Sequence, residues 1–360
     1  MRIAQVTPLY ESVPPRLYGG TERIVSYLTD ALVDLGHDVT LFASADAVTR
    51  ARLIPVRDQA IRLDPTALKC DFAAHLSLLH EVRRHVDDFD VIHFHVDLLH
   101  FPFFEDIAGS TLTTLHGRLD LKDLPGAYRR WPQFPLISIS DRQRLPLRHA
   151  NWAATVPHGI PQDLYRANLD PAAGSGKGGY LAFLGRISPE KRPDRAIAIA
   201  RATGMRLKVA AKVDGGDVAY FHNEIEPLML AEPLVEFVGE INDRDKEAFL
   251  GNAAALLFPI DWPEPFGLVM IEAMACGTPV IAWNRGSVPE VIEQGVSGFI
   301  VEDIEEAVAA VQRLPQLDRR AVRESFERRF TATVMARAYH AIYRGLAARD
   351  DAADLLAYGQ

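Results

Sequence analysis

The fold class of this chain can be predicted from residues 254–283, AALLFPIDWPEPFGLVMIEAMACGTPVIAW. This stretch begins with an apolar run, 254–258, which predicts a buried strand. A proline-rich turn follows, and residues 266–276 have the composition of a helix. A second apolar run, 279–283, predicts the next strand. A strand, a helix and a strand in this order build a parallel sheet.

The same alternation continues along the chain and predicts an α/β fold of two domains, each a parallel sheet with helices on both faces. The other predicted strands are 2–7, 37–43, 91–95, 111–115, 136–139, 180–184, 207–211 and 235–238. The other predicted helices are 21–35, 66–86, 193–203 and 245–251, and the tail 331–360 is predicted to form one or two more.

A run of glycine, alanine and serine at 171–179 predicts the connection between the two domains. We therefore expect a first domain at 1–170, a linker at 171–179, a second domain at 180–335 and a helical tail at 336–360. The linker lacks the Gly-Lys-Ser/Thr ending of a phosphate-binding Walker loop. When two such domains face each other, ligands bind in the cleft at the carboxyl ends of both sheets.

Composition excludes several classes of protein. The chain has 360 residues and a net charge of −9, which argues against a surface built to bind nucleic acid or anionic lipid. The acids beside the short basic run at 83–85 further argue against membrane contact. Cys70 and Cys276 form no disulfide framework, and no apolar run reaches spanning length. We expect a soluble cytoplasmic protein.

Two glutamates in the stretch 254–283 are candidate ligand-binding residues. Glu264 lies in the turn after a strand, and Glu272 lies on the second turn of an otherwise apolar helix. A carboxylate there can accept two hydroxyl hydrogen bonds, as a ribose diol would offer. The backbone amides of Phe266, Gly267 and Leu268 begin this helix and favour an anion. The alternative is a solvated pair of glutamates, but a charge on an apolar helix is costly without a partner.

Two cations lie in LGRISPEKRPD, residues 184–194, between a predicted strand and a predicted helix. Arg186 and Lys191 can neutralise a diphosphate without a metal ion and stabilise charge on a departing nucleotide. The alternative is an exposed basic loop.

Gly19 and Gly20 follow the first predicted strand and precede a helix that we expect Thr21 to cap. Such a segment can form a nest of amides for an anion, although a Gly-Gly pair is usually only a turn.

Four histidines follow or end strands of the first domain: His93, His95, His100 and His116. With Asp97, the first two could ligate zinc or iron, but histidines at strand ends often serve only as hydrogen-bonding partners, and we expect no metal and no cofactor. The nearby apolar run 98–104 predicts packing, with its phenylalanines as an alternative wall for an acceptor.

EPFGLVMIEAMACGTPVIA, residues 264–282, resembles the motif of the retaining family-4 glycosyltransferases, in which seven residues separate the two glutamates. The resemblance implies the GT-B arrangement of two facing Rossmann-like domains. It implies that Glu264 contacts the donor sugar, that Glu272 contacts the ribose and that Arg186 and Lys191 hold the pyrophosphate. The chain departs from the family at Arg192, where glycine is usual.

The resemblance has further implications for the first domain. Gly19 and Gly20 match a Gly-Gly that closes over the donor, and His116-Gly117 matches a His-Gly close to the transferred sugar, so His116 is a candidate catalytic residue. Residues 14–44 resemble bacterial homologues named tetrahydrobiopterin glucosyltransferases.

The function that we expect is therefore transfer of a hexose, with glucose as first choice, from a nucleoside diphosphate such as UDP to a small-molecule or glycan acceptor. Three alternatives stay open: a sugar phosphorylase, a nucleotide-sugar epimerase, and a nucleotide-sugar binding protein without activity.

Overall fold

The computed structural model describes residues 1–16, 19–170 and 179–357, and side chains as far as residue 348. The chain divides into two compact units. Unit 1 consists of Met1–Pro161 and Ala332–Gln360, and unit 2 of Gln162–Thr331. All but one residue of the predicted linker 171–179 lies outside the described residues.

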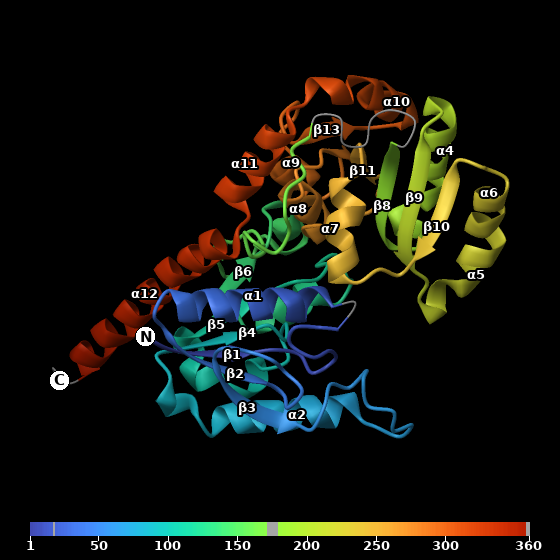
Figure 1. Ribbon diagram of the computed structural model, residues 1–360. Coiled ribbons are helices and arrows are strands. Elements are labelled where there is room, and N and C mark those ends of the chain that lie inside the picture. The colour runs from blue at the N-terminus through green and yellow to red at the C-terminus, as the bar shows by residue number, and fades with distance from the viewer. Residues whose placement is uncertain (17–18, 171–178, 358–360) are drawn as a thin grey trace. The chain divides into compact units, whose positions relative to one another are not determined.

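Unit 1 contains a parallel sheet whose strands alternate with helices (Figure 1). Its strands are β1 Arg2–Val6, β2 Asp38–Ser44, β3 Arg52–Arg57, β4 Val91–Phe94, β5 Thr111–Thr114, β6 Leu136–Ser138 and β7 Trp152–Thr155. Its α-helices are α1 Gly20–Asp34, α2 Asp71–Arg83, α3 Leu124–Arg130 and α12 Ala332–Ala357.

Unit 2 repeats this architecture. Its strands are β8 Tyr180–Arg186, β9 Arg206–Lys212, β10 Val235–Gly239, β11 Ala255–Phe258, β12 Val280–Trp283 and β13 Gly298–Val301. Its α-helices are α4 Pro193–Thr203, α5 Val218–Tyr220, α6 Glu226–Leu230, α7 Asp243–Gly251, α8 Leu268–Ala275, α9 Val288–Val291, α10 Ile304–Arg313 and α11 Arg319–Arg329.

The strand order is β3-β2-β1-β4-β5-β6-β7 in unit 1 and β10-β9-β8-β11-β12-β13 in unit 2. Every strand pair is parallel. Counted from the first strand of each unit, both orders begin 3-2-1-4-5-6, the Rossmann order. The order reverses between β1 and β4 and between β8 and β11. Ligands bind in the crevice at the carboxyl ends of such strands.

Helices cover both faces of the unit 2 sheet because its strands are apolar on both sides. Ala255 and Leu257 belong to the core that includes α4 and α10. The alternate residues Leu256 and Phe258 are also buried, on the face where α8 packs on β11 and β12 and α11 packs on α8. The fold class predicted from the sequence is confirmed for each unit.

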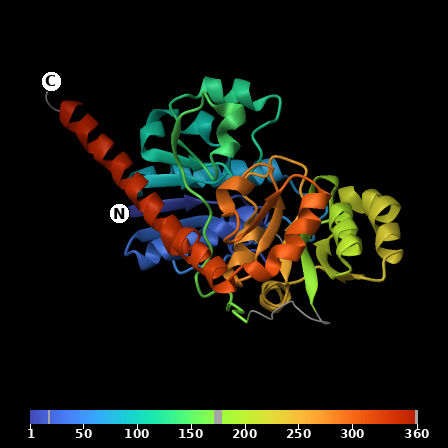
Figure 2. The same cartoon turned by 90° about the horizontal axis from the view of Figure 1, so that it is seen from above.

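The C-terminal helix α12 packs on unit 1, where it contacts α1 and β4 (Figure 2). Tyr339 and Tyr343 are buried in unit 1. The chain returns at Ala332, whose amide donates to the carbonyl of Ile160 over 2.8 Å. The helix is therefore an integral part of the first unit rather than an independent tail.

The domain boundaries differ from the predicted ones. Residues 162–170 lie in unit 2 rather than in the first domain, because Arg319 donates to the carbonyl of Asn168 over 2.7 Å and the amide of Asn168 donates to Cys276. Residues 332–335 lie in unit 1 rather than in the second domain. The composition of 171–179 marked a connection, but the backbone pairing divides the chain elsewhere.

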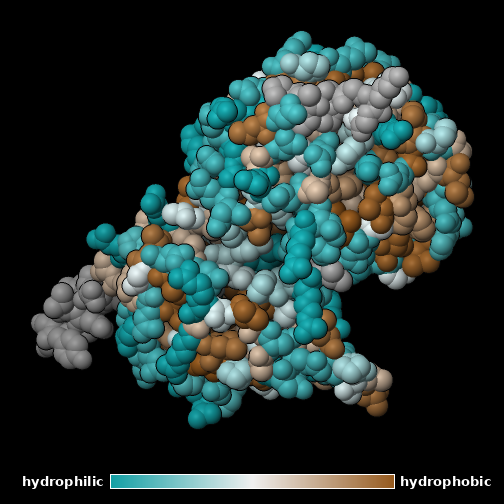
Figure 3. Space-filling view, in the orientation of Figure 1, coloured by the Kyte–Doolittle hydropathy of each residue, from teal (hydrophilic) through white to brown (hydrophobic). Residues whose placement is uncertain are grey.

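The predicted strands and helices are present with shifts at their ends. The predicted helix 66–86 is shorter, at Asp71–Arg83, and the strands β3, β7 and β13 were not predicted. The surface view is mainly hydrophilic with separate apolar areas (Figure 3). Within the described residues, no helix is both long enough and apolar enough to span a membrane.

Candidate functional site

The loops that follow β8 and β11, at the switch point of unit 2, are joined to each other. The amide of Asp261 donates to the carbonyl of Glu190 over 2.9 Å. Arg195, on the first turn of α4, donates to the carbonyls of Pro259 and Ile260 over 3.1 and 3.3 Å. These bonds hold the two candidate loops in one fixed arrangement.

Lys191 and Glu264 form an ion pair between these loops. The Lys191 side chain is 17% exposed and that of Glu264 is 11% exposed. The ammonium lies 4.9 Å from the ring centroid of Trp262 and 5.6 Å from that of Phe258, within cation–π range. Trp262 Nε1 also donates to the Glu264 carboxylate over 3.1 Å. The structure therefore brings the predicted cation and the predicted carboxylate together.

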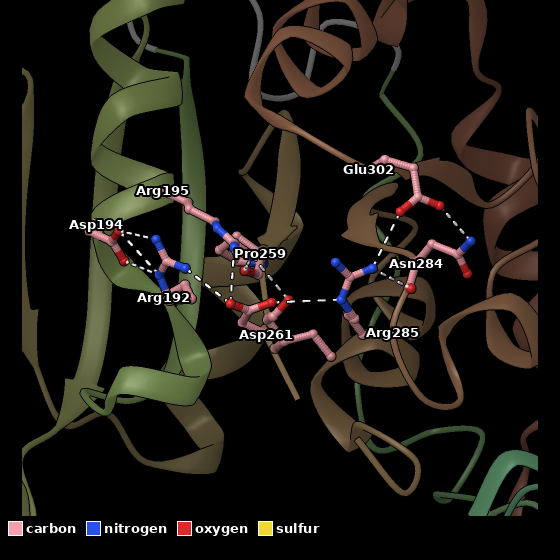
Figure 4. Close-up of polar contacts among 9 residues, drawn as sticks. Arg192, Asp194, Arg195, Pro259, Asp261, Asn284, Arg285 and Glu302 are labelled. Atoms are coloured by element: carbon pink, nitrogen blue, oxygen red, sulfur yellow. Dashed lines mark hydrogen bonds and ion pairs between the residues drawn. The ribbon is translucent and has the colours of Figure 1, made fainter. Parts of the chain in front are cut away.

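Arg192, the departure from the family glycine, has a left-handed backbone with φ 52°. Glycine adopts this conformation without strain, whereas it costs another residue about 1–2 kcal/mol. The guanidinium pairs with Asp194 at 2.7 Å and with Asp261 at 3.2 Å (Figure 4). The loop path thus has the backbone form that glycine favours, and ion pairs help to hold the arginine there.

Asp261 also contacts Arg195 at 3.2 Å and Arg285 at 3.7 Å (Figure 4). Arg285 follows β12 and pairs in turn with Glu302 at 3.3 Å. This cluster joins the loops after β8, β11 and β12. Two of its members adjoin the Lys191–Glu264 pair in the sequence, since Arg192 follows Lys191 and Asp261 shortly precedes Glu264. The cluster therefore helps to hold the loops that carry the pair.

Two glycines shape the turn that carries Glu264. Gly267 has φ 81°, and a Cβ there would lie 2.8 Å from Met270 Cε. Gly286 has φ 50°, and a Cβ there would lie 2.3 Å from the carbonyl oxygen of Glu264. Ser287 fixes the turn by two bonds, from its amide to Glu264 and from its hydroxyl to the carbonyl of Phe266. Only glycine fits at Gly286 without displacing the Glu264 backbone.

Helix α8 begins at Leu268, two residues later than predicted, with Gly267 before it. Phe266 is buried at 3% exposure, so it precedes the helix as part of the core. The amides at the start of an α-helix have no acceptor within the helix. Gly267 and Leu268 therefore keep the predicted relation to a helix N-terminus.

Glu272 is 2% exposed and pairs with Lys246 of α7 at 2.9 Å. Lys246 also contacts Asp243 at 3.2 Å. The partner that a charge on an apolar helix requires is thus a lysine of the neighbouring helix. Sequence reasoning missed Lys246, because nothing in the sequence of α7 connects it with a residue 26 positions later.

Arg186, at the end of β8, lies among acidic side chains. It contacts Glu190 at 3.0 Å, Asp214 at 3.5 Å and Asp217 at 3.9 Å. Its charge is balanced within the protein by these acids, which the sequence analysis did not anticipate. A diphosphate would have to share this guanidinium with the three acids.

In unit 1, Gly19 and Gly20 lie at the start of α1, after β1 as predicted. The predicted cap is wrong: the helix begins at Gly20 and Gly19 occupies the N-cap position, so Thr21 is already inside the first turn. Gly19 has φ 158°, and a Cβ there would lie 2.8 Å from Pro15. Close approach to Pro15 explains the glycine at this position.

Three histidines of unit 1, His95, His116 and His158, form a continuous chain of hydrogen bonds with Gln5. The amide nitrogen of Gln5 donates to Tyr343, so its oxygen accepts from His95 Nε2 over 2.8 Å. His95 Nδ1 must then accept from His116 Nε2 over 2.9 Å. His116 Nδ1 in turn accepts from His158 Nε2 over 3.4 Å. Gln5 thereby sets the tautomer of His116 through His95.

A second branch fixes His93, whose nitrogens contact Tyr343 and Thr114 at 2.7 Å each. Burial lowers the pKa of His93 and His95 well below 6.5. Among the described residues, no group of three or more His, Cys, Asp or Glu is arranged to hold a metal ion. In the structure, His93 and His95 act as hydrogen-bonding partners.

His116 follows β5, and desolvation by the surrounding protein lowers its pKa to about 3. It is neutral at pH 7, and both ring nitrogens contact histidines of the same unit. The phenylalanines of the apolar run 98–104 divide: Phe101 and Phe104 are fully buried and Phe103 is half exposed. Packing is thus the role of the two buried rings.

The geometry of each unit defines its fold. Each unit is a parallel α/β sheet of Rossmann order, the GT-B fold of the solved glycosyltransferases that the chain resembles. Solved structures share this fold over nearly the whole chain. AviGT4, a glycosyltransferase involved in avilamycin A biosynthesis, has a TM-score of 0.72 and 24% identity, covering 96% of this chain and 98% of that one.

Two further solved structures extend the likeness in fold. Sucrose-phosphate synthase from Thermosynechococcus elongatus has a TM-score of 0.77 and 20% identity, covering 97% of this chain and 100% of that one. Alr3699/HepE from Anabaena, in complex with UDP and glucose, has a TM-score of 0.72 and 17% identity, covering 96% and 100%.

The family follows from the sequence models. The one described as Glycosyltransferase Family 4 matches residues 18–227, more than half of the chain, and the one described as Glycosyl transferases group 1 matches residues 168–328. The chain belongs to glycosyltransferase family 4.

Curated relatives carry the name D-inositol 3-phosphate glycosyltransferase. The protein from Mycobacterium avium is 34% identical over 192 residues, 48% of this chain and 44% of that protein. The protein from Mycolicibacterium smegmatis is 31% identical over 186 residues, 46% and 39%. The matches span less than half the length of these relatives, which are not named for tetrahydrobiopterin.

Proposed function

We propose that this protein is a retaining glycosyltransferase that transfers a hexose from a nucleoside diphosphate sugar to a small-molecule or glycan acceptor without a bound metal ion. UDP-glucose is the first choice of donor, supported by the solved family-fold structure that contains UDP and glucose. Unit 2 binds the donor, and unit 1 binds the acceptor.

The observation that carries this proposal is the Lys191–Glu264 pair. It places a cation and a carboxylate side by side at the switch point of unit 2, where ligands bind in sheets of this order. A nucleoside diphosphate sugar needs these two groups next to each other, since its phosphates are anionic and its sugar hydroxyls donate hydrogen bonds.

The pair also suggests how the donor is received. In the structure Lys191 forms an ion pair with Glu264. When the donor binds, Lys191 turns to the diphosphate and stabilises charge on the leaving group, while Glu264 accepts from sugar hydroxyls. We assign Glu264 to sugar binding rather than to nucleophilic attack, and the bond that Trp262 donates to its carboxylate supports an acceptor role.

Glu272 and Arg186 have supporting parts in this proposal. Glu272, held by Lys246, accepts from the ribose hydroxyls. Arg186 shares its guanidinium between the acids and the diphosphate. In unit 1, Gly19, Gly20 and His116 approach the donor, and neutral His116 adds no charge to the site.

Donor use is tested by hydrolysis of common nucleoside diphosphate sugars, and the best donor then enters an acceptor screen with EDTA and Mg²⁺ arms. We expect transfer in both arms, with the anomeric configuration of the product read by NMR. Glu264→Gln tests the role of the carboxylate, and Glu305→Gln, the same charge change at an exposed residue of α10, serves as the control variant. Phosphate-dependent turnover would indicate a phosphorylase, and donor isomerisation without acceptor an epimerase. Donor binding without turnover would indicate a binding protein.

The cytoplasmic location stays a prediction from the cysteine content. Tetrahydrobiopterin likewise stays a prediction, made from the resemblance of residues 14–44.

A further inference from the structure

A pocket of about 360 Å³ lies within unit 1, on the loops that follow β4 and β5. Its walls come from residues 96–99, residues 117–119, Leu121 and helix α3, at Leu124 and Tyr128. This is the end of the sheet where ligands bind in parallel folds, and the volume is that of a small-molecule site. Gly117 of the wall directly follows His116.

The wall of the pocket is mainly apolar. Leu98, Leu99, Leu119 and Leu121 contribute to it, and the aromatic ring of Tyr128 closes it from the side of α3. Its one cation, Arg118, makes two bonds of 2.7 Å to the carboxylate of Asp120. That bidentate pair leaves little positive charge to attract an anion.

Asp97 is the one acid of this lining. Its backbone is left-handed, with φ 51°, a strained form for a residue other than glycine. Among the described residues no group donates a hydrogen bond or ion pair to its carboxylate. The residue is exposed, while nearby protein atoms partly desolvate the carboxyl and raise its pKa to about 6. The pocket therefore offers a hydrogen-bond acceptor that no described protein group occupies.

The pocket is preformed rather than left to a mobile loop. Gln143, 6% exposed, donates to the carbonyls of Leu115 and Gly117 over 2.9 and 2.8 Å. Leu119 and Tyr128 are buried at 4% and 3% exposure. A site held in this way binds a ligand without a large ordering cost.

We propose that this pocket binds the acceptor, and that the acceptor is an uncharged molecule in which an apolar ring carries a hydroxyl that donates to Asp97. This rests on the proposed function, and it names the class of acceptor. An anionic acceptor would meet the Asp97 carboxylate, a like charge, with no free cation of the lining to offset it. The expected acceptor therefore differs from the inositol phosphate in the names of the curated relatives.

The test measures binding to the full chain without any donor, by titration calorimetry or ligand-observed NMR. The probes are 2-naphthol, naphthalene-2-sulfonate and myo-inositol 3-phosphate. The first two share one ring system, on which 2-naphthol carries a hydroxyl that can donate a hydrogen bond and the sulfonate carries a negative charge. We expect 2-naphthol to bind at least about fivefold more tightly than either anion.

Variants locate the site. Leu121 is 51% exposed in the pocket wall, and Leu145 is 45% exposed outside it, so Leu121→Gln and Leu145→Gln are matched substitutions with little risk to folding. We expect Leu121→Gln to weaken 2-naphthol about fivefold and Leu145→Gln to leave it unchanged. Asp97→Asn should narrow the preference for 2-naphthol over the sulfonate.

Several outcomes would overturn the proposal: equal or tighter binding of an anion, no measurable binding of any probe, or the same response in both leucine variants. Because these measurements need no donor, they are independent of the hydrolysis screen. Failure of that screen with intact naphthol binding would reject the transferase function and keep the apolar site. Donor hydrolysis or transfer without binding of 2-naphthol would reject the proposed class of acceptor and leave the transferase function intact.

Discussion

Replacing Glu264 by glutamine should affect nucleotide binding and sugar transfer in opposite directions. Glutamine keeps the size of the side chain and an oxygen that can accept from Trp262 Nε1, but it removes the charge that holds Lys191. UDP lacks the sugar, so it should compete only for Lys191 and should bind more tightly to the variant. A donor sugar should lose its contact with the carboxylate.

The size of each effect follows from the contacts. The two side chains of the pair are 17% and 11% exposed. Ion pairs near a surface contribute about 0.2–1 kcal/mol. Taking about 1 kcal/mol for this partly shielded pair predicts about fivefold tighter binding of UDP. A lost hydrogen bond to a charged group costs about 1.5–3 kcal/mol, which predicts a fall of about 13- to 160-fold in kcat/KM for transfer.

Calorimetric titration of UDP into wild type, Glu264→Gln and Glu305→Gln measures the first effect, and steady-state transfer measures the second. The Glu305 variant carries the same charge change at an exposed residue of α10 and should match wild type in both measurements. Weaker UDP binding in Glu264→Gln would refute the idea that Glu264 competes for Lys191. Unchanged transfer would refute its contact with the sugar.

Other predictions concern the donor loops and the acid stability of unit 1. Lys191→Ala should lower kcat/KM for the donor by at least about tenfold, and wild-type kinetics would remove it from the site. Glu272→Ala should weaken UDP binding. It should also lower the free energy of unfolding of unit 2 by about 3 kcal/mol, because the shielded Lys246 loses the carboxylate that balances its charge. Chemical denaturation measures the second effect, and a variant with wild-type stability and UDP affinity would contradict both the structural and the binding role of Glu272. The free energy of unfolding of Arg192→Gly should stay within about 1 kcal/mol of wild type, because relief of the left-handed strain offsets the lost ion pairs. Arg192→Ala should be about 1 kcal/mol less stable than the glycine variant, because alanine keeps the backbone strain. Equal stability of the two variants in calorimetry would show that the backbone at this position is not strained. The buried histidines His93, His95 and His116 have pKa values in the folded state below the unfolded value of 6.5. The unfolded state therefore binds more protons as the pH falls below 6.5. Each such histidine then removes up to about 1.4 kcal/mol of stability per pH unit. Asp97, with its raised pKa, opposes this as a single group. Amide hydrogen exchange at pH 7 and pH 5, corrected for intrinsic rates, should show that β4 of unit 1 loses protection before β11 of unit 2. Equal loss of protection in both strands would contradict the histidines as the cause of the acid instability.

Much of each unit could be read from local sequence. The apolar run before Pro259 and the helical pattern after it are properties of neighbouring residues, and β11, α8 and β12 appear with end shifts of one or two residues. The predicted helix 193–203 has the observed bounds. Strands β3 and β7 escaped prediction because they are only partly buried, so they lack an apolar run.

The sequence alone determined the fold class, the family resemblance and the loops in which the candidate residues lie, because hydrophobic period and motif spacing are carried by residues close together in the chain. Only the tertiary structure decided which side chains meet. Lys191 and Glu264 are 73 residues apart, and Glu272 meets Lys246 across two helices. Strand order and helix packing set those pairings, as they set the return of α12 to unit 1, and neither is a property of any single segment.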